Sequence, residues 1–253
     1  MPLPEIVLIA VLQIFRWSRV VCTHYTLHKS EAALSRVARA IGHAYRQTSW
    51  VVDRYNIRIS ETAPVFARQS GETSLLPMMF GLVPSFMRDK PKKKLLHNAR
   101  SETITNLPSF REAVRFRRCL IPANGFYESL TSGKVSRPFI FMLKEDEPFA
   151  IAGIWEPSKD DLPPSFSMVT THPNEFVAKL HDRMPVVLTP LDMPRWLGDE
   201  PLPDGLLQKL CQPIFGNLMD AREVNRYANK PRSEGPGCLA PPDEPDLELK
   251  LGV

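Results

Sequence analysis

The sequence lacks the features that most quickly assign a chain to a class of protein. Its four cysteines form no C-x-x-C pair and no closely spaced set, which excludes a disulfide framework and indicates reduced thiols in a cytosolic protein. The longest apolar run, at 6–15, is too short to span a bilayer. No internal repeat is visible. We therefore expect a protein without a membrane anchor.

Residues 1–21 also lack the marks of a targeting signal. Arg16 and Arg19 follow the apolar run instead of preceding it, and no small-x-small cleavage site is present. Val20 and Val21 provide no small side chain of the kind expected before a lipidated cysteine. Secretion and lipid attachment at Cys22 are therefore not expected.

What the chain does contain is typical of a globular protein. Among its 253 residues, 43% are apolar and 24% are charged, and the net charge is +4. The 25 prolines are spread along the chain, which favours short strands and ordered loops over a helical bundle. These patterns predict an α+β fold with a curved or closed sheet.

Local patterns predict short elements along the chain. Ser30 is a suitable N-cap ahead of an apolar stripe, and Asn124-Gly125 between two apolar runs is a hairpin signal. The expected elements are helices at 30–45, 109–118, 175–181 (capped by Asn174) and 193–198, hairpins at 119–129 and 137–155, and a strand at 165–171.

Four segments concentrate reactive side chains: VVCTHYTL, LLHNARSET, PANGFYES and KLHDRMPVVL. Taken singly, each reactive residue fits a structural role, such as a small buried hydrophobe or a helix-end histidine. Taken together, they provide a nucleophile, an amide, a carboxylate and an imidazole. The candidate catalytic residues are Cys22, Asn98, Glu128 and His181.

The order of these segments resembles the SRAP family, the SOS response-associated peptidases. N-A-R-x-E at 98–102 and H-D-R-x-P at 181–185 carry the resemblance, which runs from Cys22 to about Pro231. It implies a single domain at 22–231 with a barrel-like, mainly antiparallel β core and short flanking helices. The Pro- and Gly-rich segment 232–253 is expected to be a disordered tail.

The resemblance also implies a function, covalent crosslinking to abasic sites in single-stranded DNA. An N-terminal cysteine suits that chemistry because its α-amine, with a pKa of roughly 8, is partly neutral near pH 7 and can attack an aldehyde. Its sulfur then closes a thiazolidine ring. Since an internal cysteine has only an amide nitrogen, we expect 1–21 to be absent from the mature protein, through a mis-called start at Val21 or through proteolysis.

Further roles follow from the resemblance. Asn98 holds the amine or a sugar oxygen, Glu128 shuttles protons, and His181 protonates the sugar to favour ring opening. Arg100 and Arg183 bind phosphate or sugar beside the site, and Thr170 positions the backbone. We expect neither a metal nor a cofactor, and a monomeric, bacterial, cytoplasmic protein associated with the nucleoid.

Charge distribution independently favours DNA binding. Residues 88–100 contain six cationic side chains and one anionic side chain, and RFRR at 115–118 adds more positive charge. Phe86 and Met87 stand where the family places bulky wedges between bases. The remaining candidate DNA-binding residues are Arg54, Lys92, Lys93 and Lys94.

Two positions depart from the family pattern. The family typically begins Met-Cys-Gly-Arg-Phe, whereas Cys22 is followed here by Thr23, His24 and Tyr25. The missing arginine puts one DNA contact in doubt, for which His24 is a partial substitute. Ser129 stands where an aromatic residue is expected after the glutamate.

Three other functions remain open at this point. A cysteine peptidase would use Cys22 and His181 as a thiolate–imidazole pair with Asn98 as orienting or oxyanion residue. A metal-binding module would use Cys22, His24 and His28. A non-catalytic single-strand-binding protein would need none of the four candidate catalytic residues.

Overall fold

The computed structural model describes residues 22–87, 94–132, 135–159 and 161–243. The expected leader at 1–21 lies outside the described residues. Within the described ranges, no helix is long and apolar enough to cross a membrane. The elements are β1 (His24–Leu27), α2 (Ser30–Ala40), β2 (Arg54–Arg58), β3 (Thr62–Gln69), β4 (Glu72–Phe80), η1 (Ser85–Met87), β5 (Asn98–Arg100), α3 (Arg111–Phe116), β6 (Arg118–Ala123), β7 (Gly125–Ser132), β8 (Val135–Leu143), η2 (Lys144–Asp146), β9 (Phe149–Glu156), β10 (Ser165–Thr171), η3 (Val177–Lys179), β11 (Met184–Pro185), β12 (Val187–Leu188), α4 (Met193–Trp196), α5 (Asp204–Leu210), η4 (Gly216–Leu218), β13 (Met219–Glu223), η5 (Arg226–Asn229) and η6 (Pro236–Leu239).

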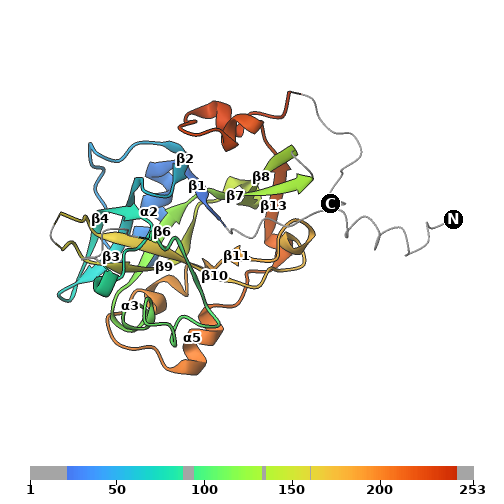
Figure 1. Cartoon of the computed structure of the whole chain (residues 1–253). Coiled ribbons are helices and arrows are strands. Elements are labelled where there is room, and N and C mark those ends of the chain that lie inside the picture. Colours follow the sequence, from blue (N-terminus) through green and yellow to red (C-terminus); the bar gives the residue numbers. More distant parts are fainter. Residues whose placement is uncertain (1–21, 88–93, 133–134, 160, 244–253) are drawn as a thin grey trace, which may run out of the picture.

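The described strands form two sheets (Figure 1). The smaller sheet has the order β13-β8-β7-β1-β2, and each neighbouring pair is antiparallel. In the larger sheet β10, β4, β3, β6 and β9 pair in succession, and β9 pairs with β10 again, so these strands close a ring. The predicted α+β fold with a curved, mainly antiparallel β core and short helices is confirmed.

Alternation along the strands separates two hydrophobic cores. On β6, Cys119 and Ile121 belong to a core shared with the smaller sheet, whereas Leu120 belongs to a second core. Helices α2, α3, α4 and α5 contribute to this second core, and α3 and α5 lie near the same end of the larger sheet (Figure 1). Cys22 is part of the shared core, so the candidate nucleophile enters the fold between the two sheets.

The two predicted hairpins are wrong. β6 and β7 flank Asn124, but β6 pairs with β3 and β9 while β7 pairs with β1 and β8. Asn124 is buried and accepts a hydrogen bond from the Lys29 amide where the chain crosses between the sheets. β8 and β9 likewise belong to different sheets, with η2 between them. Each turn signal marks a change of sheet.

Other local predictions hold in part. The first helix ends at Ala40, and Ser30 is its first residue instead of its cap, because its hydroxyl donates to Asp53. The helix expected at 109–118 is shortened to α3, and its start has no side-chain cap. The helix expected at 175–181 is shortened to η3, and Asn174 Oδ1 accepts the Val177 amide at 2.8 Å at its start.

The expectation of a disordered tail is wrong for residues 232–243. Glu234 accepts a hydrogen bond from Arg54 Nε at 2.8 Å, which ties this segment to β2. Cys238 in η6 is fully buried in a small core against the smaller sheet. Residues 244–253 lie outside the described residues.

Candidate functional site

The pairing of β1 with β7 brings Cys22 to Glu128. Tyr25 lies opposite Phe126 in this antiparallel pair, so continuing the register carries the residues before β1 toward Glu128. The backbone nitrogen of Cys22 donates to Glu128 Oε1 at 2.7 Å. Both residues are buried. Two segments separated by about a hundred positions thus meet at one carboxylate.

His181 approaches the other oxygen of the same carboxylate from the loop after η3. Its Nε2 lies 3.6 Å from Glu128 Oε2, and its ring is fully buried. The Arg183 amide donates to its Nδ1 at 3.1 Å. Asp182 Oδ1 also lies 3.1 Å from Nδ1, so a backbone donor and a carboxylate both approach that nitrogen, while Nε2 faces Glu128.

The environment of Glu128 moves its titration into the neutral range. Burial raises the pKa of this carboxyl to about 7, while nearby His181 and the hydrogen bonds from Cys22 partly oppose the rise. A carboxyl group with that pKa exchanges protons readily near neutral pH. It is therefore suited to general acid–base catalysis.

Burial moves the pKa of the Cys22 thiol away from the neutral range. Burial raises its pKa well above the usual value, and the charge of Glu128 raises it further. The sulfur is thus held as a thiol and not as a thiolate.

Asn98, Arg100 and Thr170 lie on two neighbouring parallel strands. In the β5–β10 pair, Asn98 is opposite Met168 and Arg100 is opposite Thr170. Met168 belongs to the same core cluster as Cys22. Arg100 is exposed, whereas Thr170 is buried and its carbonyl accepts the Ser101 amide.

Arg183 is anchored by Glu102, a residue to which no role was assigned from the sequence. Its guanidinium bonds both carboxylate oxygens of Glu102 and donates to the Thr170 carbonyl at 2.7 Å. This pair joins the two recognised motifs, because Glu102 is the last residue of N-A-R-x-E and Arg183 belongs to H-D-R-x-P. The sequence offered one signal for this ion pair, an acidic residue in one motif and a basic residue in the other.

The other predicted DNA-binding residues are scattered. Phe86 in η1 is 54% exposed, Met87 is half-buried and Lys94 is exposed. Arg54 pairs with Glu61 and Glu234, which neutralise its charge. Lys92 and Lys93 lie outside the described residues.

Part of the RFRR segment is structural. The Arg118 side chain is buried and donates to backbone carbonyls around α3 and α4, including that of Trp196 at 2.6 Å. Arg117 pairs with Glu156. The prediction that the whole segment adds charge for DNA is therefore wrong for these two residues.

His24 does not replace the missing arginine as a cation. Burial, followed by the charge of Arg58, lowers its pKa to about 4, although its bond to Asn56 opposes the shift. His28 contacts Asp146 instead of sharing a centre with His24. Among the described residues, no group of three His, Cys, Asp or Glu side chains is placed to hold a metal ion.

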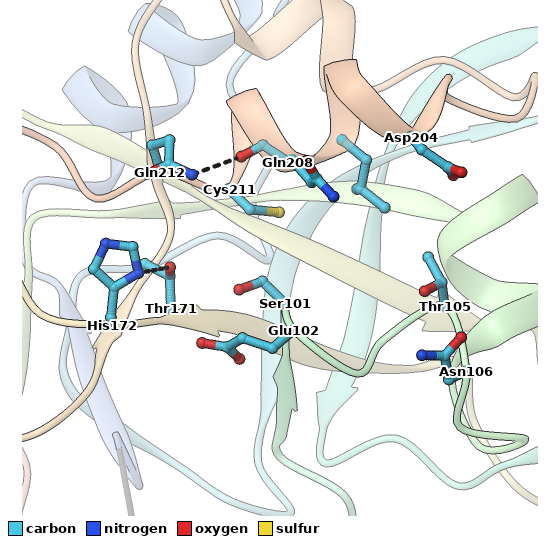
Figure 2. Close-up of a pocket in the computed structure, with 11 residues that line it drawn as sticks. Ser101, Glu102, Thr105, Asn106, Thr171, His172, Asp204, Gln208, Cys211 and Gln212 are labelled. Carbon is cyan, nitrogen blue, oxygen red and sulfur yellow. Dashed lines mark hydrogen bonds between the residues drawn. The ribbon is translucent and has the colours of Figure 1, made fainter.

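Two cavities lie beside the candidate site residues, one lined by Glu128 and the other by Glu102. The first, the Glu128 cavity, has a volume of about 400 Å³, and its lining residues are Thr23, His24, Arg58, Tyr127, Glu128, Ser129, Thr131, Ser136 and Asn229. The second, the Glu102 cavity, has a volume of about 420 Å³, and its lining residues are Ser101, Glu102, Thr105, Asn106, Thr171, His172, Asp204, Leu207, Gln208, Cys211 and Gln212. Figure 2 shows Ser101 and Glu102 across the Glu102 cavity from Gln208 and Cys211.

Sequence comparisons place the chain among characterised relatives. The family described as SOS response associated peptidase (SRAP) matches residues 21–231. The chain is 33% identical over 190 residues to abasic site processing protein YoqW of Bacillus subtilis, covering 73% of this chain and 84% of that protein. It is 28% identical to abasic site processing protein HMCES of Gallus gallus, covering 73% of this chain and 60% of that protein.

Solved structures share the fold. A protein from Bacteroides thetaiotaomicron aligns with a TM-score of 0.69 and 23% identity, covering 87% of this chain and 99% of that one. A phage-related protein from Bordetella bronchiseptica aligns with a TM-score of 0.65 and 21% identity, covering 80% of this chain and 94% of that one. These likenesses establish the fold alone.

Proposed function

We propose a function from one premise: the chain belongs to the SOS response associated peptidase (SRAP) family. We infer that it captures abasic sites in single-stranded DNA covalently, through the α-amine and the thiol of Cys22. The observation that carries this proposal is the 2.7 Å contact from the Cys22 nitrogen to Glu128, with His181 at the second carboxylate oxygen. Relatives named for the processing of abasic sites support the choice of lesion.

The chemistry balances without a further reactant. The α-amine adds to the open-chain aldehyde of the abasic sugar and loses one water to give an imine. The sulfur of Cys22 then adds to the imine carbon while the thiol proton moves to the nitrogen. A five-membered thiazolidine ring results. The amine acts first in this order, which suits a site where burial holds the sulfur as a thiol.

Glu128 serves as the proton shuttle. Burial raises the pKa of its carboxyl group, so it accepts a proton from the ammonium form of Cys22 and returns it to the carbinolamine hydroxyl, which leaves as water. The first transfer occurs over the hydrogen bond from the Cys22 nitrogen to Glu128. In the second, the carboxyl group donates to the hydroxyl on the adjoining carbon.

The other candidate residues act on the DNA. His181 donates a proton to the sugar ring oxygen, which favours the open aldehyde. Asn98 holds the amine or the sugar oxygen through its amide. Exposed Arg100 contacts phosphate. Thr170 lies opposite Arg100, and the bond from Arg183 to the Thr170 carbonyl holds this strand against the segment that carries His181.

The active form must begin at Cys22, because an amide nitrogen has no free lone pair for the aldehyde. A start at codon 21 followed by methionine removal would provide that form, and so would cleavage of the Val21–Cys22 bond. Mass spectrometry of the protein from its native host distinguishes the two routes. Cleavage of the Val21–Cys22 bond requires a longer precursor that contains residues before Cys22, whereas a start at codon 21 does not. A native chain that retains residue 21 throughout would exclude the mechanism.

The proposal is tested with an oligonucleotide that carries one abasic site. Protein beginning at Cys22 should give an adduct that resists denaturant and heat. Cys22→Ala and Cys22→Ser both keep the α-amine but lack the sulfur, so each should give only a reversible imine and lower the yield of the stable adduct at least 100-fold. Equal crosslinking by Cys22→Ala and wild type, or no adduct from protein beginning at Cys22, would contradict the proposal.

The peptidase alternative gains no support from the thiol. A cysteine peptidase needs a thiolate, and burial together with Glu128 raises the pKa of Cys22 in the opposite direction. Turnover of an unrelated peptide, abolished by Cys22→Ala, would reinstate it. A non-catalytic single-strand-binding protein would bind the same DNA without a covalent adduct.

A further inference from the structure

The Glu128 cavity lies where β1, β2, β7, β8 and η5 meet, beside the proposed covalent site. Hydroxyl and amide groups make up most of its polar lining. One guanidinium, that of Arg58, and one carboxylate, that of Glu128, complete the charged groups among the lining residues. Hydroxyls, an amide and a guanidinium are donors that suit a phosphodiester oxygen.

His24 is fixed in this wall as a neutral ring. Its Nδ1 lies 2.7 Å from Asn56 Oδ1, and Asn56 Nδ2 donates to Ser233 Oγ, also at 2.7 Å. The donors on Nδ2 fix Oδ1 as the acceptor, so Nδ1 carries the ring proton. The ring stacks on Tyr127 with centroids 4.6 Å apart. His24 gives the cavity shape but no positive charge, because burial and the charge of Arg58 lower its pKa to about 4.

Arg58 is the cross-strand partner of His24. The β1–β2 register places the two residues directly opposite, and the Arg58 side chain lines the cavity. Its Nη2 donates to the Ala228 carbonyl, which holds the side chain without neutralising it. Its Nε is buried with no hydrogen-bond partner among the described residues.

Two other arginines of the region differ from Arg58 in this respect. Arg54 and Arg183 each form ion pairs with carboxylates. Within the described part of the chain, no carboxylate forms an ion pair with Arg58. Its charge remains available for an anion that enters the cavity.

We propose that the Glu128 cavity is a phosphodiester subsite and that Arg58, not the β1 residue opposite it, supplies its positive charge. This inference rests on the proposed function, since the phosphate is one that flanks the abasic sugar at Cys22. The hydroxyls of Ser129 and Thr131 donate to the same phosphate. The β1 residue His24 provides no positive charge, and Arg58 on the neighbouring strand β2 supplies it instead.

The test measures binding without the covalent step. A single-stranded oligonucleotide with a tetrahydrofuran analogue of the abasic site has no aldehyde, so it cannot crosslink. Arg58→Gln should weaken binding about tenfold and reduce the salt dependence by about one phosphate contact. Arg58→Lys should restore much of the salt dependence. Exposed Arg39, replaced by Gln, is the matched control for the same change in net charge.

A double-mutant cycle identifies the phosphate. Each phosphate near the analogue is replaced in turn by a neutral methylphosphonate. At one position wild type should lose about tenfold in affinity, while Arg58→Gln loses no more than about twofold. Thr131→Asp, which places a negative charge in the same cavity, should weaken binding independently of any effect of Arg58 substitutions on folding.

Three outcomes would overturn the inference. One is unchanged affinity and salt dependence in both Arg58→Gln and Thr131→Asp. Another is equal losses for wild type and Arg58→Gln at every methylphosphonate position. The third is competition by inorganic phosphate in wild type with no methylphosphonate effect, which would identify a site for a free anion. The proposed function is judged separately, by crosslinking of the aldehyde-bearing DNA with Cys22→Ala.

Discussion

The Glu128 cavity and the Glu102 cavity have nearly the same volume, about 400 and about 420 Å³, and each has a glutamate in its wall. The environments of the two carboxyls are opposite. Burial raises the pKa of Glu128 to about 7. Burial also raises the pKa of Glu102, but the hydrogen bonds and charge of Arg183 outweigh it and hold the value below its usual range. One carboxyl group exchanges protons, and the other stays ionised to hold an arginine.

The two cavities also differ in their cations. Arg58 lines the Glu128 cavity, whereas no lysine or arginine is among the residues that line the Glu102 cavity. Polar side chains line both, as Figure 2 shows for the second. A phosphate is therefore expected in the first cavity alone. Comparison of the two cavities shows that the groups around a glutamate decide its role.

The largest expected effect comes from removing each carboxylate in turn. Glu128→Gln should lower the crosslinking rate at pH 7 by about 100-fold, because the proton shuttle is lost. Glu102→Gln should lower it about threefold, because Arg183 keeps its bond to the Thr170 carbonyl. Single-turnover crosslinking with abasic DNA measures both. Equal losses in the two variants would remove the distinction between the cavities.

The pH dependence of stability should have opposite signs at the two glutamates. The pKa of Glu128 rises from 4.5 to about 7 on folding, so the folded state is favoured below 4.5 and loses stability as pH rises to 7. Glu128→Gln should thus gain about 2 kcal/mol over wild type between pH 5 and pH 8. Glu102 has a lowered pKa, so it stabilises the fold above its unfolded value and loses that effect in acid.

Urea unfolding at both pH values measures this difference, on chain that retains residue 21 so that no ammonium group enters the site. Glu102→Gln is the matched comparison, and its gap to wild type should narrow as the pH falls. A constant gap between Glu128→Gln and wild type across the range would show that Glu128 titrates normally.

The smallest effect is expected at another buried cysteine, Cys211. Cys211 lines the Glu102 cavity and is 4% exposed, so Cys211→Ala should lower the thermal midpoint by a few degrees. Crosslinking yield should remain within about twofold of wild type. A loss comparable to that of Cys22→Ala would mean that the reactive thiol had been misassigned.

The candidate site was predictable because its residues fall in short motifs. Cys22, Glu128 and His181 were all singled out from the sequence, and the structure joins them through Glu128. Their roles remain proposals. The part played by Glu102 could not be predicted because it depends on Arg183, which is distant in the sequence, and the neutrality of His24 could not be predicted because it depends on burial and on the charge of Arg58.

The fold also has features that the sequence predicted and features that it did not. Local patterns located β6 to β10, but both predicted hairpins were wrong because a turn signal such as Asn124-Gly125 reports a change of direction and not the strand that pairs next. Segment 232–243 was expected to be disordered from its composition, yet the chain buries Cys238 against the smaller sheet.

The sequence by itself determined the α+β class, the family motifs and the candidate reactive residues, because these depend on residue type and near spacing. Only the tertiary structure decided which strands pair, which arginine keeps a free charge, and which glutamate is held near neutral pKa. Burial and the charge of a distant neighbour control those properties, and both arise only when β1 and β7 lie side by side.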